Sequence, residues 1–406
     1  MDLNLDGQER LSEYFSSIGS VLKNKKRRAS FALYAYGLVA EGERKSVEPI
    51  ATRACPSPEG ADAAHQRLLH FLVDSNWSDR DVRREAARYA LAAMVEREPV
   101  ESWIVDDTGF LKQGKHSVGV QRQYTGSAGK VTNCQVGVSL SVATRTERLP
   151  VDFELYLPDA WANDPARRHE ARIPESIAFK TKPELALDMI DRALDDGLPP
   201  APLLADAYYG NSSEFRNQLR LRGLDYAVGI DSTTKVWPVD VRDRRRGPAL
   251  SVRDLALQII ERGGFRRVTW RNGTKQQLSA RFAVRRVLPF HKDGWDPASE
   301  RERVWLVCEW PDDTEPAKYY FVATLEKLGK KQMIRLIKER WKTERVYEDL
   351  KGELGLDHYE GRRFPGWHHH VSAVLCCYAF IVAERVRRFP PQARRQESHD
   401  PLAGAA

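Results

Sequence analysis

Hydrophobic residues in the first hundred positions recur at helical intervals. In "HQRLLHFLVDSNW" and "DRDVRREAARYALAAMV" the apolar residues stand three and four positions apart, the period of an amphipathic helix. We therefore expect residues 1–98 to form an all-helical N-terminal domain. Its basic run "KNKKRRAS" is a candidate for binding DNA phosphates, although such a run is also typical of a solvated surface.

From Pro99 the pattern changes to short runs of apolar and β-branched residues. "SWIVDDTGF", "NCQVGVSLSVAT" and "LPVDFELYL" are separated by turns that contain glycine, which predicts an antiparallel meander. "PELALDMIDRALDDG" predicts a helix closing at Gly197, and "APLLADAYYG" predicts a buried strand that ends in Asp206. A helix over "SSEFRNQLRLRG" and a strand over "LDYAVGI" complete residues 99–231.

The remaining chain divides into three parts. Residues 232–326 contain strand-like runs such as "LSARFAVRRVLPF" and "RVWLVCEW", which predict a β-rich insertion. Residues 327–390 return to helical patterns, and their run "VSAVLCCYAFIVA" has 13 residues, too few to cross a bilayer, so we expect a buried helix and no membrane partner. Residues 391–406 are rich in Pro, Gln, Arg and Ala, and we expect a disordered tail.

The composition indicates which binding partners and which cellular compartment to expect. The formal net charge of +7 makes a polyanion a plausible partner without indicating a fold. The five cysteines include no CxxC pair, which predicts neither a disulfide framework nor a zinc site. The first ten residues are acidic and polar, unlike a secretory signal, so we expect a cytoplasmic protein.

Three carboxylates are candidates for a metal site. Asp106 ends the first predicted strand, with Asp107 as an alternative in the register; Asp206 ends the strand after the first crossover helix, and Glu344 lies on a helix beyond the insertion. Each strand-terminal Asp taken alone is more often structural. Carboxylates gathered at one sheet edge repel one another unless cations bind, and hard oxygen ligands suit two Mg²⁺ ions, for which Mn²⁺ can substitute.

The stretch "RWKTERVYEDLKGELGLDHYEGRR" interleaves acids and bases on a predicted helix. Arg340, Glu344 and Lys351 share one stripe of this helix, so a candidate ligand stands between two cations that could contact phosphates. Glu348 is on the same stripe and competes for the ligand role. Ordinary salt bridges would explain these pairs, but not their coincidence with two strand-terminal Asp residues.

At these residues the chain resembles the DDE transposases of bacterial insertion sequences. Arg340, Glu344 and Lys351 match the signature Tyr, two residues, Arg, three residues, Glu, six residues, Lys, with Ile337 where Tyr is expected. "DDTGF" resembles the first-Asp motif and "ADAYYG" the second. "DDTGFLKQGKHSVGVQRQY" and "ERKSVEPIA" are most similar to the insertion sequence 701 type, and this likeness covers about residues 25–385.

The resemblance implies an α/β fold: an RNase H-like mixed sheet with helices on both faces, interrupted by the β-rich insertion and preceded by the helical domain. It implies a transposase in which Asp106, Asp206 and Glu344 hold two Mg²⁺ ions while Arg340 and Lys351 position phosphates. Its partners would be double-stranded DNA, as terminal inverted repeats and target, and a second copy in a homodimer. The alternatives are a non-cleaving DNA-binding regulator and a nuclease without strand transfer.

Other residues carry weaker signals. Basic residues after the first strand are candidates for phosphate contact or for an ordinary basic hairpin: Lys112, Lys115, His116 and Arg122. An insertion Trp could stack on an extruded base, though a Trp in a strand is more often core, and the sequence does not choose among Trp237, Trp270, Trp295, Trp305 and Trp310. Adjacent residues on a helix point in different directions, so His368, His369 and His370 cannot chelate one ion together; packing or DNA contact is expected instead.

Overall fold

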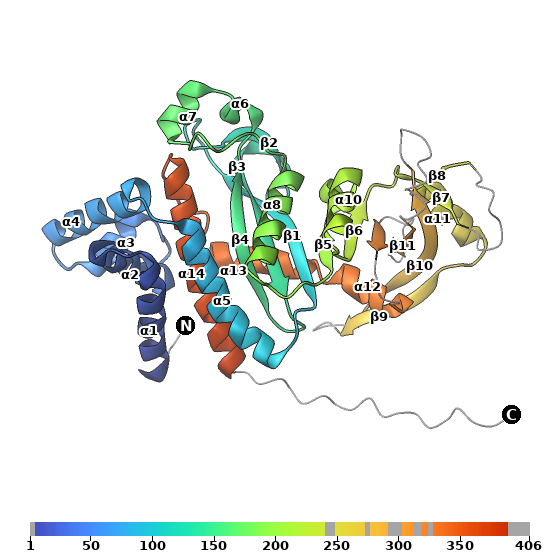
Figure 1. The fold of residues 1–406 in the computed structure, drawn as a ribbon, viewed down its shortest axis with the longest axis horizontal. Helices are drawn as coiled ribbons and strands as arrows, with labels where there is room; N and C mark the ends of the chain where they lie inside the picture. Colours follow the sequence, from blue (N-terminus) through green and yellow to red (C-terminus); the bar gives the residue numbers. More distant parts are fainter. Residues whose placement is uncertain are drawn as a thin grey trace.

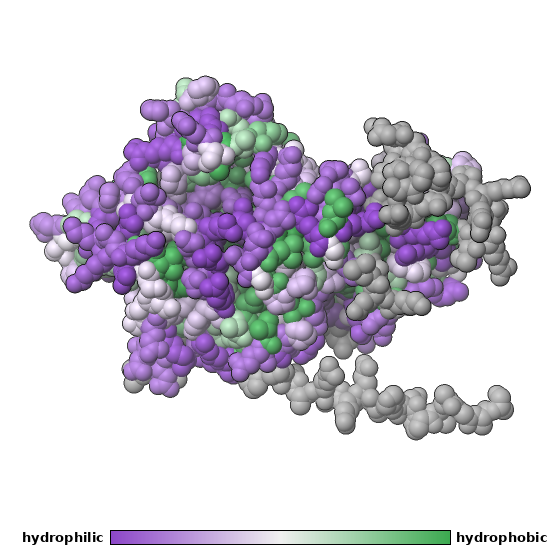
Figure 2. Space-filling model, in the orientation of Figure 1, coloured by the Kyte–Doolittle hydropathy of each residue, from purple (hydrophilic) through white to green (hydrophobic). Residues whose placement is uncertain are grey.

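The computed structural model describes residues 5–239, 248–272, 277–290, 303–311, 318–323 and 328–388. A large sheet occupies the centre of the molecule, with the N-terminal helices at one end and a strand-rich part at the other (Figure 1). On the face drawn in Figure 2, hydrophilic residues predominate over the N-terminal helices, and hydrophobic residues gather in patches over the central part. The tail 391–406, predicted to be disordered, lies outside the described residues.

The core sheet has the strand order β4-β3-β1-β5-β6. Its strands are β1 (Ser102–Leu111), β3 (Lys130–Ala143), β4 (Arg148–Tyr156), β5 (Leu203–Ala205) and β6 (Tyr226–Ile230). β1, β3 and β4 pair antiparallel, whereas β5 lies parallel to both β1 and β6. A short strand, β2 (Gln121–Thr125), pairs with the first half of β3. This mixed α/β sheet confirms the predicted RNase H-like fold class.

Amphipathic helices connect and cover these strands. The crossovers to β5 and β6 contain α8 (Lys182–Asp195) and α10 (Ser213–Leu221), which begin at the polar N-caps Thr181 and Ser212. α8 carries a capping box, in which the Thr181 side chain accepts from the Glu184 backbone N–H. Shorter helices lie between strands: α6 (Asp159–Ala162), α7 (Pro165–Ala171) and α9 (Ala207–Gly210).

The N-terminal helices share one hydrophobic core with the last helix, α14 (Phe364–Arg388). They are α1 (Leu5–Val21), α2 (Lys25–Val39), α3 (Val47–Ala54), α4 (Pro58–Leu69), which continues as a π-helical turn over His70–Asp74, and α5 (Asp79–Arg97). Tyr14 on α1 donates to the Cys376 carbonyl at 2.8 Å, and Arg10 pairs with the fully buried Glu384 at 2.7 Å. Because this core also includes β1, the domain boundary at residue 98 stays a prediction.

α14 is longer than the apolar run that predicted it. The run of 13 residues lies within a helix of 25 residues, so the run underestimated the helix length. Among the described residues, α14 alone has the length and apolar composition of a membrane-crossing helix, and 89% of its most apolar window is buried inside the protein. The predicted buried helix is therefore confirmed.

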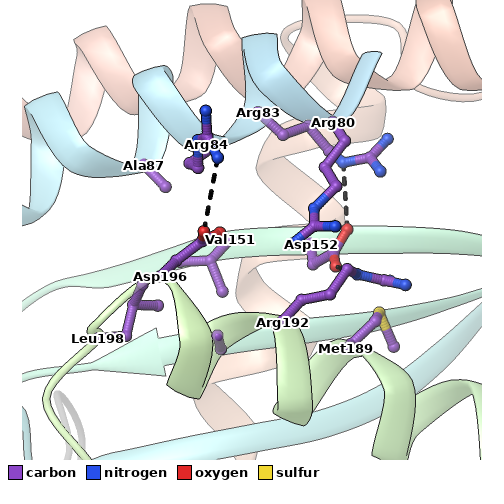
Figure 3. Close-up of a pocket in the computed structure, with 11 residues that line it drawn as sticks. Arg80, Arg83, Arg84, Ala87, Val151, Asp152, Met189, Arg192, Asp196 and Leu198 are labelled. Atoms are coloured by element: carbon purple, nitrogen blue, oxygen red, sulfur yellow. Dashed lines mark hydrogen bonds and ion pairs between the residues drawn. The ribbon is translucent and has the colours of Figure 1, made fainter. Parts of the chain in front are cut away.

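Paired charges tie α5 and α8 to β4, around a cavity of about 30 Å³ (Figure 3). The Arg83 side chain, 3% exposed, has Nε 3.1 Å from Asp152 Oδ1, and Arg192 has Nη2 2.7 Å from Asp152 Oδ2. Arg84 Nη1 lies farther from its partner, 3.7 Å from Asp196 Oδ1. Separating a buried pair would leave an uncompensated charge inside the protein, which is energetically costly. These contacts therefore hold α5 and α8 against β4.

The predicted β-rich insertion continues the core sheet. It contains β7 (Lys235–Pro238), β8 (Leu250–Ser251), α11 (Val252–Glu261), β9 (Arg266–Asn272), β10 (Gln277–Pro289), β11 (Val304–Trp310) and β12 (Lys318–Ala323). β12 pairs antiparallel with β6, so the strand order runs on from β6 through β12, β11 and β10 to β7 and β8. The sequence interpretation missed α11. Ser251, which accepts from the Asp254 N–H, was the available start signal. The boundaries at 231 and 326 stay predictions.

The helix expected from Arg340 onward ends before the stretch of acidic and basic residues that predicted it. α12 (Lys330–Lys338) and α13 (Trp341–Gly352) are separate helices, and residues 353–363 are not helical. Arg340 is the N-cap of α13 rather than an interior residue, but its backbone has helical dihedral angles (φ −55°, ψ −32°). The stripe that joins Arg340 to Glu344 is therefore kept.

Candidate active site

The two acids predicted to end their strands lie on neighbouring parallel strands, but only Asp206 follows a strand end, because β1 continues past Asp106 to Leu111. β1 and β5 pair with Trp103 opposite Leu203 and Ile104 opposite Leu204. The same register brings Asp106, on β1, beside Asp206, which directly follows β5. Asp206 caps α9, where its Oδ1 accepts from the Tyr208 N–H at 2.9 Å, and this cap fixes the carboxylate at the sheet edge. The register between the two parallel strands thus places the two acids next to each other.

α13 brings the third acid and a cation to the same place. Arg340 Nη1 donates to Asp106 Oδ2 at 2.9 Å, and Arg340 Nη2 lies 3.5 Å from Glu344 Oε1. The Glu344 side chain is 65% exposed, so it is free to rotate, whereas Arg340 is half-buried. Ile337, where the resemblance expects Tyr, is 5% exposed and packs in a hydrophobic core.

These groups open onto one cavity of about 680 Å³. Asp106, Asp206, Arg340, Glu344 and Lys351 all line it. Lys351 Nζ donates to Thr108 Oγ1 at 2.9 Å and to the Gly109 carbonyl at 2.8 Å, so the ammonium ties α13 to β1. The structure therefore brings together the three predicted acids and both cations of the predicted stripe.

Burial governs the ionisation of the acids. It raises the pKa of Asp106 to about 7; the Arg340 guanidinium opposes this rise, and the charges of Asp206 and Asp107 add to it. Burial likewise raises the pKa of Asp206 against the effect of Arg340. The pKa of Arg340 is itself raised, because attraction to Asp106, Asp206 and Glu344 outweighs its burial. The site holds more negative charge than one guanidinium neutralises.

Asp107 and Glu348 were the competing candidates, and both also line the cavity. Asp107 Oδ2 accepts from Lys182 Nζ at 3.0 Å and from the Tyr209 hydroxyl at 3.4 Å, so it is held by α8 and α9 rather than by Arg340. Glu348 pairs with Arg345 at 2.9 Å. The geometry favours Asp106 and Glu344, the two acids that share Arg340.

The carboxylates of the site suit a divalent cation once the Glu344 and Arg340 side chains move. Carboxylate oxygens are the ligands that Mg²⁺ prefers, and burial raises the pKa of Asp106, so a cation beside it would stabilise its charged form. As the side chains stand, however, no three His, Cys, Asp or Glu residues in the described part of the chain lie close enough together to hold a metal ion. Asp106, Asp206 and Glu344 would hold an ion once Glu344 rotates inward and Arg340 yields its contact with Asp106.

The predicted DNA-binding residues of the β1–β2 connection do not line the cavity. Lys112 Nζ donates to the Tyr359 carbonyl at 2.6 Å, and burial lowers the pKa of this ammonium. Lys115 and Arg122 are exposed. The sequence interpretation missed several cavity residues, among them Lys182, Tyr124 and Tyr208, because nothing in the local pattern shows that β2, α8 and α9 meet here.

The three adjacent histidines pack inside the protein. His369 stacks on Trp77 with ring centroids 3.8 Å apart, and His368 Nε2 lies 3.3 Å from Glu154 Oε2. His370 is fully buried. Their sequence pattern thus marks helix packing, the first of the two roles expected for them.

The described Trp residues of the insertion are half-buried. Trp270 lies 4.6 Å from Lys338 Nζ, and Trp310 lies 3.7 Å from the guanidinium carbon of Arg281. Trp305 stacks similarly on Arg286 at 4.9 Å, and Trp237 packs beside Phe290. Trp295 lies outside the described residues.

Comparison with known proteins identifies the family. A relative from Microchaete diplosiphon, "Probable transposase for insertion sequence element IS701", is 28% identical over 223 residues, which cover 55% of this chain and 54% of the relative. The chain thus matches about half the length of that relative. The family model for the DDE superfamily endonuclease matches residues 16–277, a span that includes Asp106 and Asp206 and ends before Glu344. With well over half of its length in this match, the chain belongs to the DDE superfamily endonucleases.

Proposed function

We propose that the protein is a DNA transposase of the insertion sequence 701 type, which cleaves transposon ends and joins them to target DNA. One observation carries the proposal. Asp106, within β1, lies beside Asp206, which follows the parallel strand β5, and Glu344 opens onto the same cavity from α13. Three acids and a nearby guanidinium suit phosphoryl transfer, in which negative charge develops on a phosphodiester.

The proposed roles follow from the contacts. Asp106, Asp206 and Glu344 would hold two Mg²⁺ ions, which supply Lewis acidity to the attacking and leaving oxygens when bound. Arg340, released from Asp106, is within reach of a phosphate at the acids, and Lys351 keeps α13 against β1. A water molecule attacks the phosphorus and loses a proton, the P–O3′ bond breaks, and the leaving O3′ takes up a proton to become a 3′-hydroxyl. This hydroxyl then attacks a phosphorus of target DNA, and the target P–O3′ bond breaks in turn.

The partners follow from the same proposal. Terminal inverted repeats and target DNA would be the substrates, a homodimer would bring two ends together, and the reaction would take place in the bacterial cytoplasm. The formal net charge of +7 supports a polyanionic substrate.

Matched carboxylate variants test the proposal. DNA carrying the element's own ends is incubated with protein and Mg²⁺, and nicked and joined products are separated on a denaturing gel. We expect Asp106→Asn, Asp206→Asn and Glu344→Gln to lose cleavage by at least about 100-fold while still binding DNA. Asp107→Asn and Glu348→Gln change acids that line the same cavity, and we expect both to keep cleaving.

Other outcomes identify the alternatives. Nicked products without joined products indicate a nuclease that lacks strand transfer. Binding without any cutting by the wild-type protein indicates a DNA-binding regulator. Normal cutting by Asp206→Asn contradicts the assigned site.

A further inference from the structure

Two exposed aromatic side chains line the cavity that holds the acids. Tyr124 on β2 is 63% exposed and Tyr208 on α9 is 54% exposed, and both lie on its wall. In the sheet order, β2 is two strands from β1 on one side, and α9 follows β5 on the other. The two rings therefore flank the acids of β1 and β5.

The Tyr208 ring also has a cation against it. Lys182 Nζ lies 4.6 Å from the ring centroid and 3.0 Å from Asp107 Oδ2, and the Lys182 side chain is only 13% exposed. Tyr209, by contrast, is fully buried. Its ring centroid lies 5.6 Å from that of Tyr208, so it packs against the Tyr208 ring and restricts its movement. An exposed ring backed by a second ring and held near an ammonium is a fixed surface on which a flat ligand can stack.

The cavity has room for the nucleotides next to a bound phosphodiester. Its volume of about 680 Å³ lies within the range of sites that enclose small molecules. If a phosphodiester lies at Asp106 and Asp206, the bases attached to it lie beside the cavity walls. Aromatic side chains stack on unpaired bases of any sequence, because every base has a π-face.

We infer that Tyr208 and Tyr124 stack on unpaired nucleobases flanking the phosphodiester that is cut, and that Lys182 contacts the backbone phosphate next to the Tyr208 base. This inference rests on the proposed function and adds the form of its substrate: a DNA end whose terminal bases are unpaired. The described insertion Trp residues are half-buried against other side chains, which leaves the two tyrosines as the exposed rings of this cavity.

A fluorescence experiment tests the stacking without requiring catalysis. The probe is a duplex of about 20 base pairs with a short single-stranded dT overhang that carries one 2-aminopurine, a base whose fluorescence is quenched on stacking. In Ca²⁺ buffer, we expect the wild-type protein to quench this probe and to bind it more tightly than the blunt duplex. Tyr208→Phe keeps a ring and should retain both effects.

Leucine variants remove the aromatic face at similar volume. We expect Tyr208→Leu and Tyr124→Leu each to lose the quenching and to bind the overhang about 5- to 150-fold more weakly, the range for one base stack. Tyr36, on α2, is 41% exposed and does not line the cavity, so Tyr36→Leu is the matched control and should behave as the wild type. Circular dichroism checks that each variant is folded.

The outcomes separate this inference from the proposed function. Quenching that survives in both leucine variants overturns the stacking, as does a wild-type protein with no preference for the overhang. If the wild-type protein quenches the probe but never cuts DNA in Mg²⁺, the stacking stands and the transposase activity fails. If it cuts and joins while Tyr208→Leu matches it in every assay, the activity stands and the stacking fails.

Discussion

Arg340 Nη1 lies 2.9 Å from Asp106 Oδ2, although the two residues are 234 positions apart in the chain. The same guanidinium approaches Glu344 Oε1 at 3.5 Å, so a side-chain cation bridges two of the three proposed metal ligands. Binding of a divalent ion must therefore compete with this contact. Release of Arg340 from Asp106 would make its guanidinium available to a phosphate at the moment the ion binds.

Removing Arg340 should increase the stabilisation that Mg²⁺ provides. In Arg340→Gln the buried Asp106 loses its partner, which should cost the metal-free protein roughly 1–3 kcal/mol. Mg²⁺ restores the balance of charge, so the rise in Tm on adding Mg²⁺ should be larger in the variant than in the wild type. Differential scanning calorimetry with EDTA and with Mg²⁺ measures both values.

Arg345 gives the control for this experiment. It lies on the same helix, and its side chain is 56% exposed and pairs with Glu348. We expect Arg345→Gln to show the wild-type response to Mg²⁺. An equal or smaller Mg²⁺ response in Arg340→Gln would contradict a competition between the guanidinium and the ion.

Gly210 should be essential to the position of Asp206. A Cβ at Gly210 would lie 1.9 Å from the Gly229 carbonyl oxygen, a backbone atom of β6 that cannot move aside alone. Gly210→Ala should therefore displace α9, whose N-cap is Asp206, and lower DNA cleavage by about tenfold or more. A Cβ at Gly114 would meet nothing within 4 Å, so Gly114→Ala should cleave normally. Gel assays of cleavage compare the two variants, and equal rates would show that α9 tolerates the shift.

Local sequence pattern predicted the elements that carry the acids. The continuous apolar runs before Asp106 and Asp206 indicate buried strands, and β1 and β5 carry these acids on paired parallel strands, although β1 runs on past Asp106 to Leu111. The helical spacing of Glu344 from Arg340 is equally local, and the break before α13 did not disturb it. These features depend on neighbours within a few positions, and for that reason the sequence reveals them.

Features that depend on distant contacts could not be predicted in this way. Lys112 looked available for phosphate, but its ammonium is taken by the Tyr359 carbonyl, 247 positions away. Lys182 carries no motif of its own, and Tyr208 stands in "ADAYYG" without a predicted role; both reach the cavity only because α8 and α9 pack beside β1 and β5. Side-chain direction and burial at such positions are set by tertiary packing, which local periodicity does not encode.

A buried ion pair should couple the insertion to the helices of the site. Lys338, at the end of α12, pairs with Glu309 on β11, and their side chains are 14% and 5% exposed. Glu309→Leu leaves Lys338 without this partner and should cost roughly 3–5 kcal/mol of unfolding free energy. The double variant Glu309→Leu/Lys338→Met should lose clearly less than the sum of the single variants, with a coupling of about 1–3 kcal/mol.

Urea unfolding of the four proteins in this cycle gives the coupling energy. The exposed pair Arg345 and Glu348 gives a comparison cycle on the neighbouring helix, in which we expect a coupling of at most about 1 kcal/mol. Additive losses for Glu309 and Lys338 would show that the pair does not hold β11 to α12.

His370 should make the protein less stable as the pH falls below neutral. Its Nε2 lies 3.2 Å from the Gly355 carbonyl and 3.1 Å from the Leu356 carbonyl, so Nε2 carries the proton, and Nδ1 accepts from the Tyr34 hydroxyl at 2.8 Å. Burial lowers the pKa of His370 from 6.5 to about 4. The unfolded chain therefore takes up a proton near pH 6.5, whereas the folded protein resists it until about pH 4.

Because the unfolded chain takes up this proton more readily, lowering the pH reduces the free energy of unfolding. Stability that is present above pH 6.5 is lost as the pH falls toward 4, and between pH 7 and pH 5 the loss due to His370 amounts to about 2 kcal/mol. His370→Gln should be less stable at pH 7, yet it should lose about 2 kcal/mol less than the wild type over this interval. Urea unfolding at both pH values measures the difference, and a His370→Gln variant with an unchanged pH dependence would show that this imidazole does not titrate on unfolding.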